Sequence, residues 1–133
     1  MTQNFRHNIA SGSKLEPIIG FSRAVRAGNQ IYVAGTAPIP MISGEETPKS
    51  VYEQTKLCFE IAKTAIENAG GSLKDVVRTR IMLTDITTWE EAGKAHGEFF
   101  GEIRPVCTFV GVSGFIKPEW LVEIEVDAVI EQL

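Results

Sequence analysis

Leu121-Val-Glu-Ile-Glu-Val-Asp-Ala-Val-Ile130 is the most regular stretch of the sequence. Successive side chains of a β-strand point to opposite faces, so Glu123, Glu125 and Asp127 share one face of this segment. The other face carries apolar residues, namely Val122, Ile124, Val126, Ala128 and Ile130. The stretch therefore predicts a strand with one core face and one acidic face.

Such an acidic row needs basic neighbours, because carboxylates two residues apart on a strand lie roughly 7 Å from each other and repel. The segment 76–84 supplies them, since Arg78 and Arg80 fall on one parity. The other parity carries the apolar residues Val77, Ile81 and Leu83. We therefore expect the two strands to lie in one sheet with their charged faces together.

A long helix is predicted from Pro48 to Ala69, with Thr47 and Pro48 at its start and Gly70-Gly71 as its end. Apolar residues recur along it at three- and four-residue spacing, which predicts one buried stripe. They are Leu57, Cys58, Ile61, Ala62, Ala65, Ile66 and Ala69. Because Cys58 belongs to this stripe, we interpret it as a buried structural thiol.

A shorter helix is predicted to end at Phe100. Its start has the spacing of a capping box, either from Thr87 to Glu90 or from Thr88 to Glu91. His96 lies on this helix without an acid or a thiol three or four residues away, so we interpret it as an ordinary helix-side histidine.

The remaining segments predict strands. An edge strand is possible near Phe5–Ile9, and residues 18–26 and 31–35 predict a hairpin around the turn 27–30. Pro105–Val112 is a further β-rich run, opened by a proline that a strand tolerates at its start. Two helices on one face of a mixed sheet make an α+β fold, in a single domain over residues 1–133.

Charge and composition exclude several classes of function. The chain has 13 Lys and Arg against 17 Asp and Glu, which argues against nucleic acid as a partner. No apolar run approaches the roughly 20 residues that cross a bilayer, and the N-terminus lacks the apolar core of a signal peptide. We expect a soluble cytoplasmic protein with no membrane partner.

The potential metal ligands are scattered. Cys58 and Cys107 form no Cys-x-x-Cys pair, and His7 and His96 have no metal-ligand spacing to them or to each other. We expect no metal site. The charged face of the sheet, in contrast, is too large to leave bare, and either water or other copies of the subunit must cover it.

Several short segments, in their order and spacing, resemble the RidA/YjgF family, also called endoribonuclease L-PSP-like or Rid proteins. They are Val33-Ala-Gly-Thr-Ala-Pro38, Ala69-Gly-Gly71, Thr84-Asp85, Phe99-Phe100, Arg104-Pro105 and Val122-Glu-Ile-Glu125. The resemblance runs from about residue 15 to the C-terminus. No single segment is specific, but the set is.

The resemblance implies a chorismate-mutase-like α+β fold, assembled as a homotrimer with a cleft between each pair of neighbouring subunits. It also implies an activity, the hydrolysis of reactive enamines and imines to ketoacids and ammonia without metal or cofactor. The partners implied are therefore a small imine or enamine metabolite and two further copies of the chain.

The family's proton-transferring glutamate is the first of the Glu-x-Glu pattern in the last strand, and it matches Glu123. The alternative for Glu123 is a strand-face glutamate paired with Arg78 or Arg80. Repulsion from Glu125 on the same face would raise the pKa of Glu123, which suits general acid and base catalysis.

The family anchors the substrate carboxylate with an arginine in a Pro-x-Arg-Ser/Thr pattern, and this chain has Cys107 in its place. Arg23 is our preferred replacement, because Arg104 has the opposite parity to Cys107. Alternatively, the substrate has no carboxylate there and Cys107 shapes a smaller, more apolar pocket. In a third reading Cys107 is a nucleophile, although the sequence places no histidine beside it.

The sequence thus predicts Glu123 and Cys107 as catalytic residues. The predicted substrate-binding residues are Phe21, Arg23, Gly35, Thr36 and Phe109, with Gly35 and Thr36 contributing backbone N–H groups. A non-catalytic trimer that binds or senses a small ligand is the main alternative function. RNA cleavage is disfavoured by the acidic charge and by the lack of an aromatic and basic platform.

Overall fold

The computed structural model describes residues 5–131. Its strands are β1 (Arg6–Ile9), β2 (Ala24–Ala27), β3 (Gln30–Thr36), β4 (Val76–Leu83), β5 (Val106–Gly111) and β6 (Val122–Val129). Its helices are α1 (Val51–Asn68) and α2 (Trp89–Phe100), with short helical turns η1 (Glu16–Gly20), η2 (Leu73–Asp75) and η3 (Ile86–Thr88).

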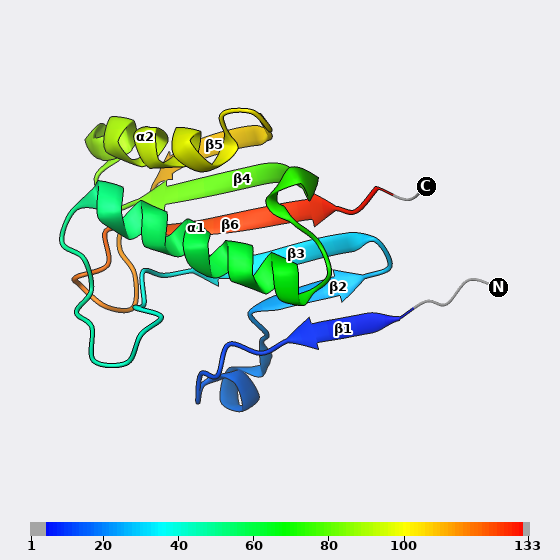
Figure 1. The fold of residues 1–133 in the computed structure, drawn as a ribbon. Helices are drawn as coiled ribbons and strands as arrows, with labels where there is room; N and C mark the ends of the chain where they lie inside the picture. The colour runs from blue at the N-terminus through cyan, green and yellow to red at the C-terminus, as the bar shows by residue number, and fades with distance from the viewer. Residues whose placement is uncertain (1–4, 132–133) are drawn as a thin grey trace.

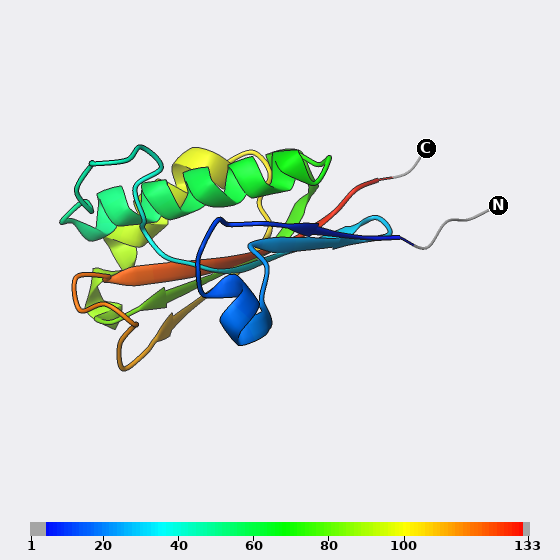
Figure 2. The ribbon, with the colours of Figure 1, turned by 90° about the horizontal axis from the view of Figure 1, so that it is seen from below.

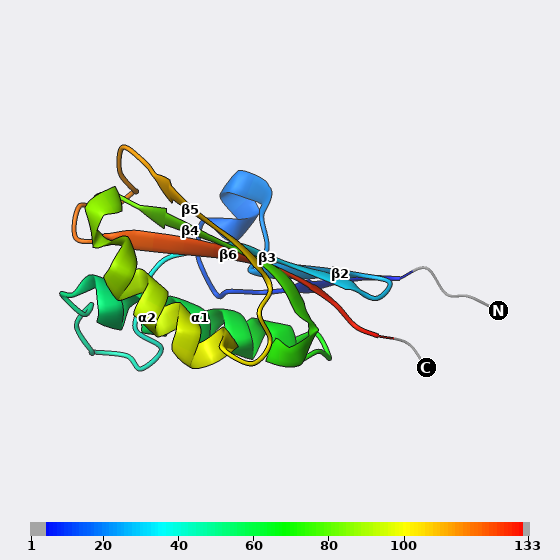
Figure 3. The same ribbon diagram turned by 90° about the horizontal axis from the view of Figure 1, so that it is seen from above.

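The strands form one sheet in the order β1-β2-β3-β6-β4-β5 (Figure 1). β4 and β5 are parallel, and the other pairs are antiparallel. Figure 2 shows α1 and α2 on one face of the sheet and η1 on the other, and Figure 3 shows the same layers from the opposite side. The predicted chorismate-mutase-like α+β fold with two helices on one face is confirmed.

β6 is central because it pairs with both β3 and β4. The predicted alternation is confirmed, since its apolar parity is buried under the helices and its acidic parity is only partly buried. β6 ends at Val129, so Ile130 lies just past the strand. The edge strand β1 is also confirmed, paired with β2.

The prediction that Val77 faces the core is wrong. The register of β4 and β6 shifts by one residue between Val76, which lies opposite Ala128, and Arg78, which lies opposite Asp127. This bulge turns Val76 inward and leaves Val77 46% exposed. Beyond the bulge the predicted parity of Ile81 and Leu83 holds.

The predicted start of α1 at Pro48 is also wrong. Ser50 is the N-cap, and its Oγ accepts a hydrogen bond from the backbone N–H of Glu53 at 3.0 Å. The Pro48 carbonyl accepts instead from the side chain of Gln54 at 2.8 Å. Ser50 and Glu53 have the spacing of a capping box, so the correct signal was present three residues downstream of Thr47.

Gln54 fixes the start of β6 against α1. Its Nε2 donates to the carbonyls of Pro48 and Glu119, and its Oε1 accepts from the backbone N–H of Leu121 at 2.8 Å. Because the side chain is fully buried and all these groups are paired, it holds the strand entry in place. Cys58, one turn further along α1, is buried as predicted, and burial raises the pKa of its thiol.

Neither predicted capping box at the start of α2 forms. Asp85 takes over the capping role, and its Oδ1 accepts from the backbone N–H of Thr87 at 3.0 Å. The hydroxyl of Thr88 donates to the Asp85 carbonyl at 2.6 Å and accepts no hydrogen bond from the first turn of α2. Residues 86–88 therefore form the turn η3 before α2 begins.

The first strand of the predicted hairpin is shorter than expected. Residues 16–20 form η1, with Pro17 in its first turn, and β2 begins only at Ala24. Pro17 and Gly20, whose φ is 89°, are both turn signals. Ile18 and Ile19 are consequently 77% and 63% exposed instead of lying in a strand.

Gly70 ends α1 as predicted and gives a stability test. Its φ of 93° is strained for any residue with a side chain, and a Cβ would come within 2.6 Å of Arg26 Nη1, which caps the helix by donating to the Ala69 carbonyl. We expect Gly70→Ala to lower the free energy of unfolding by about 1–3 kcal/mol.

Gly97→Ala is the matched control in a denaturant titration. Gly97 lies inside α2, and nothing is within 4 Å of its added Cβ. Because alanine is the better helix former, we expect this variant to be neutral or up to about 1 kcal/mol more stable. Equal losses in the two variants would contradict the assignment of strain to Gly70.

Candidate functional site

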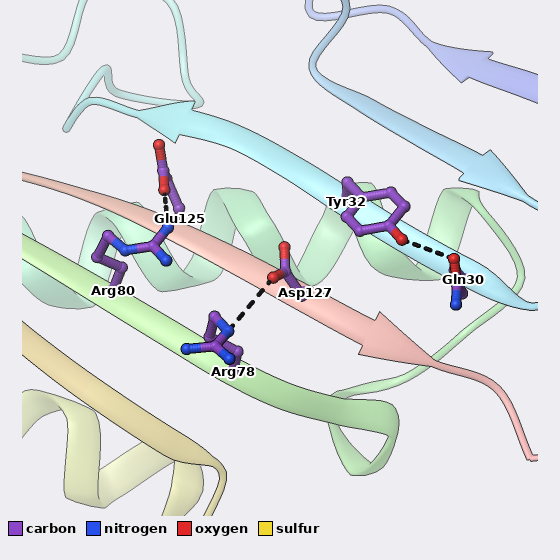
Figure 4. Close-up of polar contacts among 6 residues, drawn as sticks. All are labelled: Gln30, Tyr32, Arg78, Arg80, Glu125 and Asp127. Atoms are coloured by element: carbon purple, nitrogen blue, oxygen red, sulfur yellow. Dashed lines mark hydrogen bonds and ion pairs between the residues drawn. The ribbon is translucent and has the colours of Figure 1, made fainter.

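The acidic row on β6 meets two arginines of β4 on the sheet face away from the helices (Figure 4). Arg80 pairs with Glu125, and Arg78 Nε lies 3.7 Å from an Asp127 carboxylate oxygen. Within residues 5–131, Glu123 forms no such pair, because its partner across the ladder is Met82. The expected meeting of charged faces is confirmed, and it leaves one carboxylate without an ion-pair partner.

Gly35 lies against this carboxylate. β3 is irregular between Val33 and Thr36, where its register with β6 shifts. A Cβ on Gly35 would lie 3.2 Å from Glu123 Oε1, closer than an ordinary contact. The absence of a side chain therefore lets the carboxylate approach the β3 backbone.

Arg23 binds the same part of β3 through its guanidinium. Its Nη1 donates to the Gly35 carbonyl at 3.3 Å and to Thr36 Oγ1 at 3.1 Å. Thr36 is fully buried, and its hydroxyl in turn donates to the Ala34 carbonyl at 2.7 Å. Glu123, Gly35, Thr36 and Arg23 thus form one cluster, as the sequence predicted for a site.

Burial is the main reason that the pKa of Glu123 is raised. The positive charge of Arg23 opposes the rise, and repulsion from Glu125 adds to it. The expected effect of Glu125 is therefore present, but it is smaller than that of desolvation. A half-buried carboxylate with a raised pKa is suited to exchanging protons with a bound reactant near neutral pH.

Cys107 and Phe109 of β5 lie apart from the cluster around Glu123. Their register partners on β4 are Thr79 and Ile81, both of which are buried and face the helices. Phe109 packs edge-to-face on Trp89 of α2, with ring centroids 6.2 Å apart. Both residues therefore lie on the helix side of the sheet, whereas Glu123 lies on the other side with β4 between.

Within one subunit, the seven predicted site residues therefore do not share one face of the sheet, and the expected cleft between subunits remains a prediction. Within one subunit, Phe109 is part of the packing under α2 and does not face Glu123. Cys107 remains exposed near the sheet edge. The sequence did not reveal the face on which Cys107 and Phe109 lie. Alternation along β5 shows that the two residues share a face, but it does not show whether that face is the helix side or the side of Glu123.

Thr79, the register partner of Cys107 on β4, contacts His96 of α2. Thr79 Oγ1 and His96 Nε2 are 2.8 Å apart, and the imidazole also packs on Phe59 and Phe100. Burial lowers the pKa of His96. No hydrogen bond joins Cys107 to this imidazole in the part of the chain described, so His96 remains a packed helix-side histidine as predicted.

Two further sequence candidates lie in connecting segments. Phe21 follows η1 with an extended backbone and is partly buried, two residues before Arg23. Arg104 is exposed, and its φ of 58° places it in the left-handed region between α2 and β5. β5 begins two residues after Arg104, so parity within the strand does not determine where its guanidinium points.

A cluster of metal ligands or a long apolar helix within residues 5–131 would indicate another kind of site. No group of three or more His, Cys, Asp or Glu side chains in that range is arranged to hold a metal ion. None of the helices in the same range combines the length and apolar character needed to cross a membrane.

Comparison with known proteins supplies the family. The family model for endoribonuclease L-PSP matches residues 11–130. This chain belongs to the RidA/YjgF family. An uncharacterised protein of Streptomyces coelicolor is 42% identical to it over 96% of this chain and 95% of the relative.

Other members of the RidA/YjgF family bear on fold and activity. The crystal structure of Rv2704, a YjgF/YER057c/UK114 family protein of Mycobacterium tuberculosis, superposes with a TM-score of 0.86 at 42% identity, covering 95% of this chain and all of that one. The 3-aminoacrylate deaminase RutC of Acinetobacter baylyi is 34% identical over 81% of this chain and 85% of the relative. The family therefore includes an enzyme that deaminates an enamine.

Proposed function

We propose that this RidA/YjgF protein hydrolyses reactive enamines and imines, with Glu123 as the general base and general acid. The observation that carries the proposal is the state of the acidic row, in which Glu125 and Asp127 are paired with arginines and Glu123 is not. Glu123 is instead partly buried against Gly35 with a raised pKa. The RutC relative supports the reaction class.

The reaction needs one water and no redox partner. An enamine first takes a proton from solvent on carbon and becomes an iminium ion. Glu123 accepts a proton as water adds to the iminium carbon, which gives a neutral carbinolamine, and then donates that proton to nitrogen. As the carbon–nitrogen bond breaks, Glu123 accepts the hydroxyl proton, which leaves a carbonyl compound and ammonia. It then releases this proton to solvent and returns to its starting state. Positioning of water and substrate supplies the rest of the acceleration.

We propose that the complete site lies in a cleft between subunits of a homotrimer. Glu123 and Cys107 of one chain lie on opposite faces of the sheet, so one subunit alone does not join them. The face that carries Glu123 also exposes Tyr32 and Val77, each 46% accessible, as well as the arginine pairs. Packing of this face against symmetry-related copies would exclude water and bring the strand β5 of a neighbour to Glu123.

Within this cleft, Phe21, Arg23, Gly35 and Thr36 are proposed to line the side that Glu123 belongs to. Arg23 places positive charge beside Glu123 through its bonds to Gly35 and Thr36. Cys107 replaces the guanidinium that would grip a substrate carboxylate, so we propose a substrate without a carboxylate at that place. The free thiols of Cys58 and Cys107 agree with a cytoplasmic location.

Cys107→Arg tests the substrate assignment. We expect the variant to gain about a hundredfold in kcat/KM for 2-imino acids, because two charge-assisted hydrogen bonds to the carboxylate are restored. Carboxylate-free imines should not gain. The measurement is ammonia release from a panel of both substrate types by wild type and variant.

Cys107→Ser is the control for this comparison, since it changes the thiol without adding a charge. It should leave both substrate types within about threefold of wild type, because Cys107 is proposed to shape the pocket and not to attack. A loss of about a hundredfold or more in Cys107→Ser would instead support the nucleophile.

A non-catalytic ligand-binding trimer is the second candidate, and the arginine-to-cysteine difference favours it. Its signature is a rise in thermal stability with a small metabolite that is never turned over. Ammonia release above the buffer rate from any member of the imine panel would exclude it.

A further inference from the structure

A pocket of about 290 Å³ lies on the helix side of the sheet, apart from the cleft proposed above. It is bounded by the end of β1, by the segment 37–41 that follows β3, and by Ile61, Thr64 and Ala65 of α1. Its volume is at the lower end of the range for small-molecule sites. Of the residues that line this pocket, only Arg23 also has a part in the proposed cleft.

Arg23 is the only charged residue among those that line the pocket. Its Nη1 is engaged by Gly35 and Thr36, and its other guanidinium nitrogens have no protein partner in the described part of the chain. They are not sealed off either, because no buried side-chain nitrogen or oxygen in that part lacks a hydrogen-bond partner. Arg23, a residue that lines the pocket, therefore has solvent-accessible N–H donors that no protein group uses.

The rest of the lining is mainly apolar. Ile9, Ala37 and Ile61 belong to three different segments and form walls, with Ser11, Thr64 and Asn68 as the polar residues. Of these, Ser11 already binds Glu16 through its hydroxyl. A single fixed cation at one end of an apolar pocket matches a ligand with one negative charge and an aliphatic body.

We propose that this pocket binds a small aliphatic monocarboxylate, with the carboxylate on Arg23 and the chain between Ile9 and Ile61. The planar guanidinium pairs with a carboxylate through two parallel hydrogen bonds. Glu16 and Glu123 both act on Arg23 with opposite charge, so they partly compensate the guanidinium and disfavour a ligand with more than one negative charge.

The site has a structural link to Glu123. Arg23 holds the Gly35 carbonyl, and the backbone of Gly35 lies against the Glu123 carboxylate. A ligand in the helix-side pocket would therefore bind the same arginine that places positive charge beside the proposed catalytic group. Such a ligand is suited to modulate the reaction without entering the cleft.

Isothermal titration calorimetry with hexanoate, butanoate and 1-hexanol tests the proposal on the full chain. We expect hexanoate to bind wild type at least about tenfold more tightly than either 1-hexanol, which lacks the charge, or butanoate, which is shorter by two methylene groups. Arg23→Gln should lose this preference for the acid over the alcohol.

Thr64→Trp keeps the test independent of Arg23 and of the proposed catalysis. Thr64 is exposed on α1 and lines the pocket, so an indole there should fill it and weaken hexanoate binding at least about tenfold. Glu60→Trp, exposed on α1 outside the pocket, is the matched control and should bind as wild type does. Absence of binding to wild type, unchanged binding to Thr64→Trp, or hexanoate binding no tighter than 1-hexanol overturns the proposal.

Discussion

Replacing Glu123 by glutamine is expected to lower kcat/KM for enamine hydrolysis by roughly 10²–10⁴-fold, with the fold unchanged. Glutamine keeps the shape that packs against Gly35 but can neither accept nor return a proton. The expected loss is large because no other carboxylate in residues 5–131 lies at Gly35 without an arginine partner. Steady-state ammonia release by both proteins measures it.

Glu125→Gln is the matched control, because it removes a carboxylate two residues along the same face. Glu125 is paired with Arg80, and its loss should change the rate by less than about tenfold. Similar losses in the two variants would mean that charge on the face, and not Glu123 itself, is needed.

The pH dependence of the wild-type rate also tests whether Glu123 is the general base. A base must be unprotonated to accept a proton from water, so kcat/KM should fall as the pH falls through the pKa of Glu123. Burial raises that pKa, which moves the decline above the range of an exposed glutamate. The Glu123→Gln variant should lack this decline in its residual rate.

Replacing Phe59 by alanine is expected to cost about 3–5 kcal/mol of stability. The Phe59 ring is fully buried, and it joins α1 to α2. Its centroid lies 5.2 Å from that of Phe100, 5.5 Å from His96 and 5.6 Å from Phe99. Because these neighbours belong to a separate helix, collapse into the cavity would have to move α2 as a whole.

Chemical denaturation at one fixed protein concentration measures this cost, since any self-association also contributes to stability. Phe5→Ala is the control, because Phe5 is 45% exposed and its ring centroid lies 5.4 Å from the guanidinium of Arg26. It should lose less than about 1 kcal/mol. A loss below about 1 kcal/mol in Phe59→Ala would contradict the assigned core.

The centre of the sheet was predictable because its signal is local. Apolar and acidic residues alternate along β6 from Val122 to Ala128. The apolar side chains are all buried, and the acidic side chains are all partly buried. Val77 shows the limit of this reasoning, since the bulge beside it depends on how β4 and β6 pair and not on the composition of β4. Parity predicts a face only where the ladder is regular.

The boundaries of the helices were less predictable because several caps competed. Thr47, Ser50, Thr87 and Thr88 are all acceptable N-cap residues by type. The choice of Ser50 follows from the buried contacts of Gln54, which are formed with the segment before β6, more than 60 residues away. Such contacts are invisible to a local pattern.

The residues predicted for the site differ in how directly the sequence indicates their positions in one subunit. Glu123, Gly35, Thr36 and Arg23 were predicted together, and they lie together. The placement of Cys107 required knowing that β5 joins β4 in parallel, with its odd residues level with Thr79 and Ile81 of β4. Neither the strand order nor the strand direction is encoded in the spacing around Cys107.

The most direct measurement is the rate of ammonia release from an enamine generated in the cuvette, with and without wild-type protein at the same pH. The account predicts a rate above that of buffer, which rises in proportion to protein concentration and is lost in Glu123→Gln. A rate equal to that of buffer for carboxylate-bearing and carboxylate-free substrates alike would contradict it.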